Sequence, residues 1–306
     1  MNKKSKKLIS KILVARKLEN IKLIEEIEEY LLVNRGYVFK APTPNEPVIL
    51  IVSGGLDSVL VWSYLLIKYK ACVYPLFLRR GQRRVAFEEK AVDFFSTYFQ
   101  KKYPGFSKDV VKLDASIPPL SIRFPITIAS DDLVGKNGQK RGIPMYSNLL
   151  FSYAVQYGYF LEIEKKKKVR KILAGFMPDD GLVMKDETLT ATRLFMKAAI
   201  ELTGDESWQI SSLPLEKELG FFHKKWEWIK WGAEQKIPLE KTRSCIIWGE
   251  TQCGNCLSCI LRKNSFKKAK VKDKTVYKDP ELSFKNNIRK IFLRKIKSIF
   301  IKLRFI

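Results

Sequence analysis

Two short stretches of this sequence contain residues whose types and spacing could support chemistry. The first, SGGLDS at residues 53–58, directly follows the apolar run PVILIV. A glycine-rich loop that leaves a buried strand and opens a helix favours an anion, because backbone N–H groups and the helix dipole both face it. Here Gly54 and Gly55 allow the main chain to approach closely, and Ser53 and Ser58 add hydroxyl donors. The alternative is a plain turn between a strand and a helix.

The loop contains no lysine, which distinguishes it from the GxxxxGK[ST] loop that binds a γ-phosphate. Without that lysine, the loop suits pyrophosphate as a leaving group better than transfer of a γ-phosphoryl group. The stretch therefore predicts a nucleotide site that releases pyrophosphate.

The second stretch contains four of the five cysteines, Cys245, Cys253, Cys256 and Cys259, spaced C-x7-C-x2-C-x2-C. Two C-x2-C steps place thiolates on adjacent turns of the backbone, so one tetrahedral ion can bind all four. A zinc ion with four sulfur ligands has no open position, so we expect one structural Zn²⁺ per chain. Four reduced cysteines without a metal, or an iron–sulfur cluster, are the alternatives.

The fifth cysteine and the single histidine are expected to have other roles. Cys72 lies in an apolar run and is expected to be a buried, small hydrophobic residue. His223 has no cysteine or second histidine beside it, which favours a surface or packing role over metal binding.

Alternating strands and helices are predicted to position the two stretches. Apolar, β-branched runs at residues 47–54, 71–78, 109–114, 169–175 and 209–214 alternate with helical patterns at residues 57–69, 85–103, 146–164 and 187–202. Continuous apolar strands separated by helices are typical of a parallel sheet that is covered on both faces. We therefore predict an α/β domain at residues 45–215, followed by a small helical, cysteine-containing subdomain at residues 216–275.

The two ends of the chain are basic. Residues 1–44 are predicted to form an arm of one or two amphipathic helices and a proline-rich linker, and residues 276–306 to form an amphipathic helix. Fifty-seven Lys and Arg residues against 32 Asp and Glu residues give a net charge of +25, which favours anionic partners. No apolar run reaches the ~20 residues of a membrane-spanning helix, and the N-terminus lacks a secretory apolar core, so we expect a cytoplasmic protein.

The loop resembles the SGGxDS signature of the PP-loop, or N-type ATP pyrophosphatase, superfamily. Its members use ATP to adenylate a carboxylate, a carbonyl or an amide-like oxygen, and they release pyrophosphate. The resemblance implies an adenine nucleotide alpha hydrolase-like fold with a parallel five-stranded sheet. It also implies that Ser53, Gly54, Gly55 and Ser58 bind the pyrophosphate of ATP, and that Asp57 acts beside Mg²⁺ and the nucleotide.

Together the two stretches resemble the QueC family of 7-cyano-7-deazaguanine synthases. Its members pair the SGGxDS loop with a C-terminal SCY…CGxCxSCxLRxxaF segment, which this chain matches through Leu261 and Arg262. The sequence FLRRGQRR resembles the family's F-x-YGQRH loop, with Gln82 and Arg83 kept and Arg84 at the histidine position.

Three further segments resemble the family but depart from its pattern. IPMYSN keeps the proline and Asn148 of the family's VPGRN but not its glycine and arginine. AGFMPDDGLVMKDET places Asp180 and Asp186 at the acidic positions of GxxxxDxxxYPDCR but lacks the Tyr-Pro and Cys-Arg pairs. Lys224 takes the lysine position of an L-x-K-x-E-x-W segment, and the likeness covers residues 46–270.

The resemblance implies an ATP-dependent enzyme that adenylates the carboxylate of a 7-carboxy-7-deazaguanine and transfers the acyl group to an amine, with AMP and pyrophosphate as products. Asp57, Arg83 and Lys224 are then the candidate catalytic residues, and Gln82, Asn148, Asp180 and Asp186 are the candidate substrate-binding residues. Since Arg83 and Lys224 are basic, each could neutralise a phosphate or a carboxylate. The departures lie in the segments with which the family holds its deazaguanine, so they leave the product open.

Two products and one other function class stay open. The amine is ammonia if the product is the nitrile of queuosine biosynthesis. It is an amine on a partner protein in QueC-like paralogues associated with antiphage defence, and the altered segments and basic ends favour this reading with an acidic partner. Dimers are frequent in the family, so the resemblance leaves a homodimer open. The alternative function is a PP-loop enzyme that modifies tRNA and binds it with basic arms, although the cysteine signature favours the QueC family.

Overall fold

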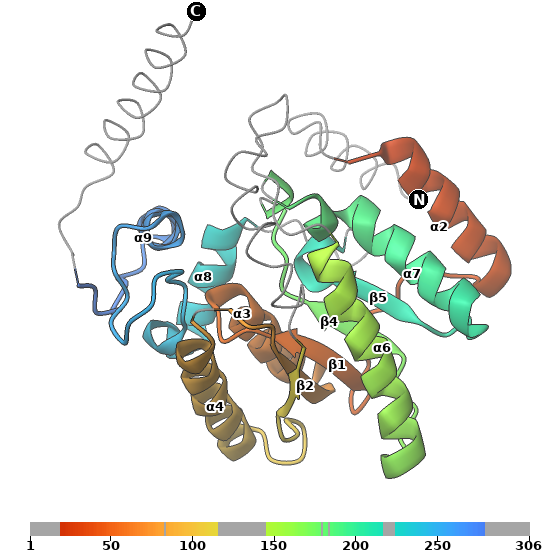
Figure 1. The fold of residues 1–306 in the computed structure, drawn as a ribbon, viewed down its shortest axis with the longest axis horizontal. Coiled ribbons are helices and arrows are strands. Elements are labelled where there is room, and N and C mark those ends of the chain that lie inside the picture. Colours follow the sequence, from red (N-terminus) through yellow and green to blue (C-terminus); the bar gives the residue numbers. More distant parts are fainter. Residues whose placement is uncertain are drawn as a thin grey trace, which may run out of the picture.

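The protein is described by a computed structural model that covers residues 19–82, 84–115, 145–178, 180–182, 184–216 and 224–278. Five parallel strands form one sheet in the order β3-β2-β1-β4-β5 (Figure 1). The strands are β1 (Pro47–Val52), β2 (Cys72–Arg79), β3 (Val111–Asp114), β4 (Lys171–Ala174) and β5 (Gln209–Ser212). The main helices are α2 (Ile21–Arg35), α3 (Leu56–Tyr64), α4 (Val85–Lys102), α6 (Tyr146–Lys165), α7 (Leu189–Thr203), α8 (Lys225–Glu234) and α9 (Leu257–Ala269). The predicted α/β fold is thus confirmed.

Helices cover both faces of the sheet. Successive residues of a strand point to opposite faces, so neighbouring residues of β1 pack against different helices. In β1, Val48 and Leu50 pack with residues of α3, α4 and α8. Ile49 and Ile51 pack on the opposite face with residues of α2, α6 and α7. Figure 1 shows the two groups of helices on either side of the strands. The continuous apolar run of β1 is therefore explained by burial on both sides.

The direction in which the chain adds strands to the sheet reverses between β1 and β4. From β1 the chain adds β2 and then β3 on one side, and it later returns to add β4 and β5 on the other side. In open parallel sheets, ligands bind beyond the carboxyl ends of the strands at this point of reversal. The SGGLDS loop follows β1, so the topology places it there.

Helix α2 is tied to the sheet domain through charged contacts with α7. Arg193 of α7 is fully buried, and it pairs with Glu28 of α2 at 3.0 Å and with Glu216 at 2.7 Å. Removing one member of such a buried pair typically costs about 3–5 kcal/mol, because the remaining charge is left without a partner. The predicted arm therefore contacts the sheet domain over α2, while residues 1–18 lie outside the described residues.

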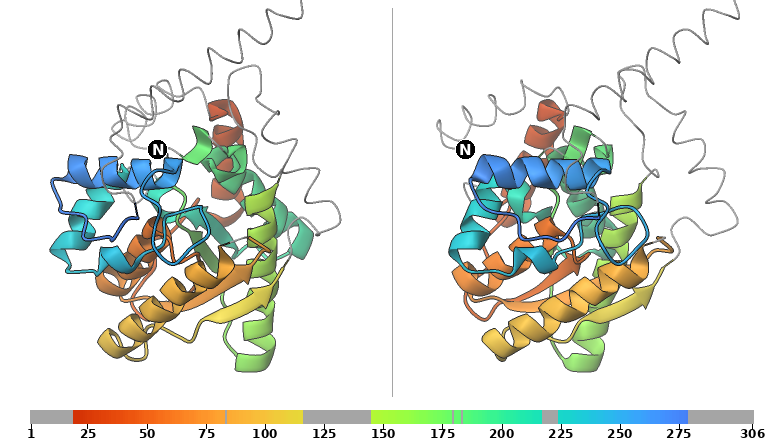
Figure 2. Two further views of the ribbon diagram at one scale, coloured as in Figure 1. Left: turned by 60° about the vertical axis from the view of Figure 1, so that its left-hand side comes forward. Right: turned by 90° about the vertical axis from the view of Figure 1, so that its left-hand side faces the viewer.

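Helix α8 links the sheet domain to the cysteine-containing segment. The Tyr64 ring of α3 lies 5.2 Å from the Trp228 ring and 4.8 Å from the Trp231 ring of α8, measured between ring centroids. Figure 2 shows α8 and α9 together beside α3. The division into domains at residues 45–215 and 216–275 stays a prediction.

Several expectations concern single residues or the ends of the chain. Cys72 lies in β2 but is only half-buried, so its expected burial is wrong; its side chain shares the face of Tyr74, which is also half-buried. Arg83, His223 and most of the predicted C-terminal helix, residues 279–306, lie outside the described residues.

Among the residues that the structure describes, no helix is both long enough and apolar enough to cross a membrane.

Candidate functional site

A cavity of about 580 Å³ lies at the carboxyl ends of β1, β2 and β4. Its polar lining includes Ser53, Gly55, Asp57 and Ser58 from the loop and α3, Arg80 and Arg84 after β2, Glu88 from α4, Asp180 and Glu187 after β4, Lys225 from α8, Arg243 and Ser244 before the cysteines, and Arg262 from α9. The two stretches that the sequence singled out therefore contribute to the same cavity.

Hydrogen bonds that involve its two serines stabilise the conformation of the SGGLDS loop. The Ser58 hydroxyl accepts a hydrogen bond from the Ser53 N–H at 3.2 Å and donates to the Gly55 carbonyl at 3.2 Å. The Gly55 N–H in turn donates to the Ser53 hydroxyl at 3.3 Å. Ser53, Gly55 and Ser58 line the cavity, as expected for an anion-binding loop, and their role in binding pyrophosphate stays a prediction.

Gly54 has a packing role in addition to its predicted role in binding pyrophosphate, which stays a prediction. Its φ angle is 66°, and a Cβ atom there would lie 2.6 Å from the Glu88 carbonyl oxygen and 2.9 Å from the Ala91 Cβ of α4. The missing side chain thus allows the loop to pack against α4. Gly54 also accepts a hydrogen bond at its carbonyl from the Arg243 N–H at 2.8 Å, which joins the loop to the cysteine-containing segment.

Gly175, which follows β4, is a site residue that the sequence analysis did not find. A Cβ atom at this position would lie 2.9 Å from both the backbone nitrogen and the Cα of Ser58. The chain after β4 therefore passes directly against the first turn of α3. A glycine directly after an apolar run is the sequence signal at this position, but it does not place the residue beside the SGGLDS loop.

Substituting Gly175 by alanine is expected to displace the loop and weaken ATP binding. The added methyl group meets backbone atoms, which cannot move aside as a flexible side chain can, so we expect a destabilisation of about 1–3 kcal/mol. Gly158→Ala is the matched control, because Gly158 lies on α6 away from the cavity lining, and a Cβ there would lie 2.8 Å from the Trp208 ring and 2.9 Å from the Val169 carbonyl. Titration calorimetry with ATP should show weaker binding for Gly175→Ala alone; equal losses in both variants would contradict this role.

Asp57 presents one paired and one unpaired carboxylate oxygen. Its Oδ2 lies 2.8 Å from the Lys225 Nζ, and its buried Oδ1 has no hydrogen-bond partner within the described part of the chain. Carboxylate oxygens are the ligands that Mg²⁺ prefers. Asp57 therefore fits a magnesium–nucleotide complex in this cavity.

Lys224 and Lys225 lie differently with respect to the cavity. Lys224 is exposed at the N-cap of α8, where its backbone N–H donates to the Glu227 carboxylate at 2.6 Å. Lys225 lines the cavity and pairs with Asp57. Lys225 was not predicted, because Lys224 takes the lysine position of the segment that resembles the family.

Two arginines from the loop after β2 line the cavity, and one buried glutamate holds them. Glu88 is 3% exposed; its carboxylate accepts from the Arg84 Nε, and from the Arg80 Nη2 at 3.4 Å. Gln82 donates to the same carboxylate at 2.7 Å and accepts from the Arg80 N–H at 2.7 Å. Gln82 therefore supports the arginine pair. The predicted Arg83 lies outside the described residues, and Arg80 was not predicted.

The segment after β4 supplies the acidic side of the cavity. Asp180 and Glu187 line it, whereas the predicted Asp186 accepts a hydrogen bond from the Ser147 N–H at 2.7 Å, at the start of α6. Burial, together with the negative charges of Asp180 and Asp186, raises the pKa of Glu187 to about 8. Asn148 is half-buried on α6, and its Oδ1 has no partner within the described residues.

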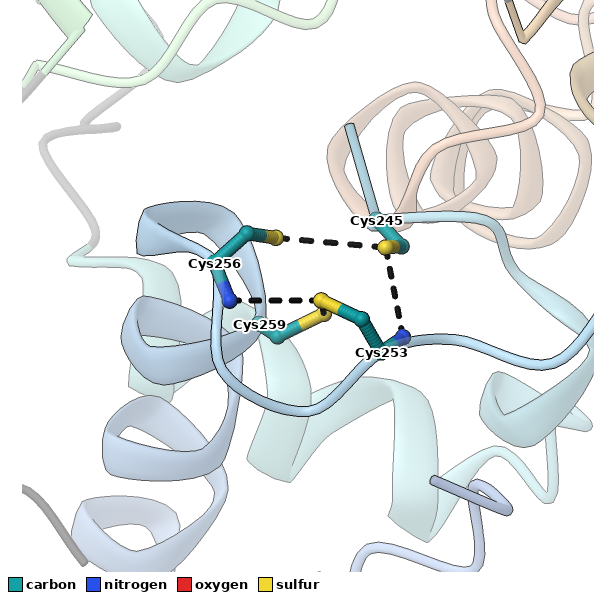
Figure 3. A group of neighbouring side chains, drawn as sticks. All are labelled: Cys245, Cys253, Cys256 and Cys259. Carbon is teal, nitrogen blue, oxygen red and sulfur yellow. Dashed lines mark hydrogen bonds between the residues drawn. The ribbon is translucent and has the colours of Figure 1, made fainter. Parts of the chain in front are cut away.

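The four cysteines of residues 245–259 form a compact group, and Figure 3 shows their sulfur atoms gathered together. All four Sγ atoms lie within 4.8 Å of one another, and the Cys253–Cys259 and Cys245–Cys256 pairs are 3.9 Å apart. Metal–sulfur bonds of ~2.3 Å in a tetrahedron place sulfur atoms about 3.8 Å apart, so the group could hold one metal ion. A cluster of several irons spreads its thiolates over different metal atoms, so the short separations favour a single ion.

Hydrogen bonds connect the cysteine group to the cavity wall. The Gln252 Oε1 accepts from the Ser244 and Cys245 N–H groups, each at 3.0 Å. Arg262, which is 1% exposed, donates to the Thr242 hydroxyl at 2.6 Å and to the Ser244 hydroxyl at 3.1 Å. The segment that begins the cysteine group is therefore held rigidly beside the SGGLDS loop.

Comparisons with known proteins agree with this arrangement. The family model described as "Queuosine biosynthesis protein QueC" matches residues 47–270. The protein named 7-cyano-7-deazaguanine synthase from Methanosarcina barkeri is 24% identical over 233 residues, covering 74% of this chain and 95% of that relative. Relatives of the same name from Desulfitobacterium hafniense (27% identical; 75% of this chain, 92% of the relative) and Campylobacter fetus subsp. fetus (29% identical; 75% and 96%) match a similar extent. This chain belongs to the QueC family.

Proposed function

We propose that this protein uses ATP to adenylate the carboxylate of a 7-carboxy-7-deazaguanine-type substrate and then transfers the acyl group to an amine. The main support is that a single cavity combines the SGGLDS loop, the Asp57 carboxylate and the arginine pair Arg80 and Arg84. Membership of the QueC family, whose relatives are named 7-cyano-7-deazaguanine synthase, points to the same substrate class.

The chemistry requires two displacements. A carboxylate oxygen attacks the α-phosphorus of ATP, a new O–P bond forms, and the bond between the α-phosphorus and the bridging oxygen breaks to release pyrophosphate. The amine then attacks the carbonyl carbon, loses a proton, and displaces AMP together with the oxygen that came from the carboxylate. Dehydration of the resulting amide to a nitrile would need the same activation of the amide oxygen by a second ATP.

The residues of the cavity have distinct tasks in this scheme. The loop of Ser53 and Ser58 at the start of α3 would stabilise the negative charge that builds up on departing pyrophosphate. Asp57 would hold Mg²⁺, which supplies positive charge to the phosphates when bound. Lys225, paired with Asp57, adds a second positive charge at the same place.

Arg80 and Arg84 are proposed to hold the substrate carboxylate in place of the arginines that the chain lacks in its VPGRN-like and YPDCR-like segments. Guanidinium groups suit carboxylates because they donate two parallel hydrogen bonds. Glu88 and Gln82 fix the position of both side chains. Of the other basic residues that could substitute, Lys185 is exposed and Arg141 lies outside the described residues.

A protein amine, as in the antiphage-defence paralogues, is a second candidate for the acceptor. Three exposed apolar side chains, Ile246, Leu257 and Leu261, also line the cavity. Exposed apolar residues beside a reaction site favour contact with a macromolecule more than with ammonia. The net charge of +25 would direct an acidic partner towards this protein.

Product masses distinguish these possibilities. The enzyme is incubated with ATP, Mg²⁺ and 7-carboxy-7-deazaguanine, with and without ammonia, and the small molecules are read by mass spectrometry. The nitrile would identify a synthase that uses ammonia, whereas an amide, or an adenylate that turns over only when a partner protein is added, would identify a conjugating enzyme. Absence of any change to the deazaguanine, together with ATP-dependent modification of tRNA, would replace the proposal with the tRNA alternative.

A further inference from the structure

We propose that Glu187, rather than Asp186, accepts the N–H donors on the guanine-type edge of the substrate. The inference deepens the proposed function and rests on it. A deazaguanine carries two adjacent donors, the ring N–H and the 2-amino group, and an ionised carboxylate can accept from both at once. The carboxylate that binds this edge must line the cavity and have oxygen atoms that can still accept hydrogen bonds.

Asp186 already has a structural task. Its Oδ2 accepts the Ser147 N–H at 2.7 Å, and so it satisfies one of the unpaired N–H groups in the first turn of α6. Asp186 does not lie among the residues that line the cavity. Its carboxylate therefore stabilises the start of α6.

Glu187 lies in the cavity wall, and the local turn fixes its position. It ends a short 3-10 helix, Lys185–Glu187, in which the Thr188 hydroxyl donates to the Lys185 carbonyl at 2.8 Å. Thr188 also caps α7 by accepting from the Ala191 N–H at 3.2 Å. The only hydrogen bond described for the Glu187 carboxylate is a long one, 3.4 Å from the Ser147 hydroxyl. Most of its capacity to accept hydrogen bonds is thus available to a ligand.

The other wall of the cavity has the opposite charge. The Arg80 guanidinium lies over the Tyr146 ring, 5.1 Å from its centroid, and Arg84 lines the same cavity. A cavity with arginines on one side and carboxylates on the other fits a ligand that has an anionic group and a donor edge. A 7-carboxy-7-deazaguanine has both features.

The charge state of Glu187 predicts how binding of the ligand depends on pH. The groups that act on it include Asp180, Asp186, Arg80 and Ser147, and Tyr146 also lies close. Burial and the two aspartates outweigh Ser147 and Arg80, which raises the pKa of Glu187 to about 8. Near neutral pH the free protein therefore holds Glu187 mostly protonated, and bound N–H donors favour its ionised form. Ligand binding should release a proton at pH 7, and affinity should increase as the pH rises towards about 8.

The same shift predicts how stability depends on pH. The pKa of Glu187 in the folded protein is raised from its usual 4.5 to about 8. The stability that its proton contributes is complete below pH 4.5 and is lost as the pH rises through about 8. Glu187→Gln cannot ionise, so above about pH 8 it should be at least as stable as the wild type. A residue with a purely structural role would instead lose stability on substitution.

The test measures equilibrium binding in the absence of ATP by titration calorimetry. The ligands are 7-carboxy-7-deazaguanine and the matching analogue that lacks the 2-amino group. Glu187→Gln should bind the guanine-type ligand about 10- to 100-fold more weakly, because one acceptor is replaced by an N–H₂ donor. The variant should also lose most of the wild type's preference for the guanine-type ligand over the analogue. Asp186→Asn is the matched control, since an asparagine oxygen can still cap α6, and its affinity should stay within a few-fold of the wild type.

The possible outcomes distinguish the role of Glu187 from the proposed substrate class. Failure of the wild-type protein to bind the deazaguanine overturns both the proposed substrate class and the role of Glu187. Binding by Glu187→Gln that equals the wild type, or a larger loss in Asp186→Asn, overturns the role of Glu187 alone. Thermal unfolding of both variants at about pH 8 completes the test, because a destabilised Glu187→Gln would also contradict the proposal.

Discussion

Cys245→Ser is expected to lose its metal ion and much of its affinity for ATP in the same variant. Serine is a poor ligand for a soft-metal site, so metal content should fall below about half an equivalent. Cys245 directly follows the segment in which the Arg243 N–H binds the Gly54 carbonyl at 2.8 Å. Loss of that hydrogen bond, worth about 1 kcal/mol, and of the local order around it should weaken ATP binding by about 10-fold or more.

Metal analysis and titration calorimetry with ATP check this prediction together. Cys72→Ser is the matched control, because Cys72 lies in β2, outside the group of four, and should keep both properties. The cysteine group forms a packing cluster of its own, separate from the two cores of the sheet, so circular dichroism should report an intact sheet domain in the variant. Unchanged ATP affinity in a metal-free Cys245→Ser variant would show that the cysteine segment does not order the loop.

Asp57→Asn is expected to reduce turnover by about 100-fold or more, with little effect on stability. The substitution keeps the shape of the side chain but removes the charge that would hold Mg²⁺, and a metal ion is worth several kcal/mol to a transition state of this kind. It also removes the negative charge that lies 2.8 Å from the Lys225 ammonium in the wild type.

Pyrophosphate release, measured under saturating ATP and Mg²⁺, provides the assay for Asp57→Asn. Asp93→Asn serves as the control, because Asp93 is on the exposed side of α4, where it pairs with Lys112 at 2.7 Å. Turnover by Asp57→Asn within a few-fold of the control would remove Asp57 from the catalytic group.

The sequence was most informative where local chemistry alone decides the outcome. The SGGLDS loop follows a strand and opens α3, and the spacing of the four cysteines brings their sulfur atoms together. Both features depend on residues that are close in the chain, so periodicity and spacing suffice. The same holds for the five apolar runs, each of which overlaps one strand of the sheet.

The sequence was less informative where the identity of a side chain depends on how a turn or helix is oriented. Lys225 rather than Lys224 lines the cavity, because the choice depends on which residue begins α8 and where its first turn points. Glu187 and Asp186 are likewise adjacent, but the 3-10 turn directs one to the cavity and the other to the start of α6. Neither orientation can be read from motif positions.

The role of Gly175 depends on a long-range contact. It meets Ser58 only because β4 pairs with β1, which the order of elements along the chain does not specify. Tertiary contacts of this kind lie beyond what spacing along the sequence can predict.

The central claim is that a substrate carboxylate is activated by transfer of AMP, and the fate of its oxygen atoms tests it most directly. The protein is incubated with ATP, Mg²⁺, an amine donor and 7-carboxy-7-deazaguanine whose carboxylate oxygens carry the heavy isotope of oxygen. Mass spectrometry of the nucleotides should then show one labelled oxygen in AMP and none in pyrophosphate. Labelled inorganic phosphate with ADP as the other product, or AMP without label, would contradict adenylation of the carboxylate.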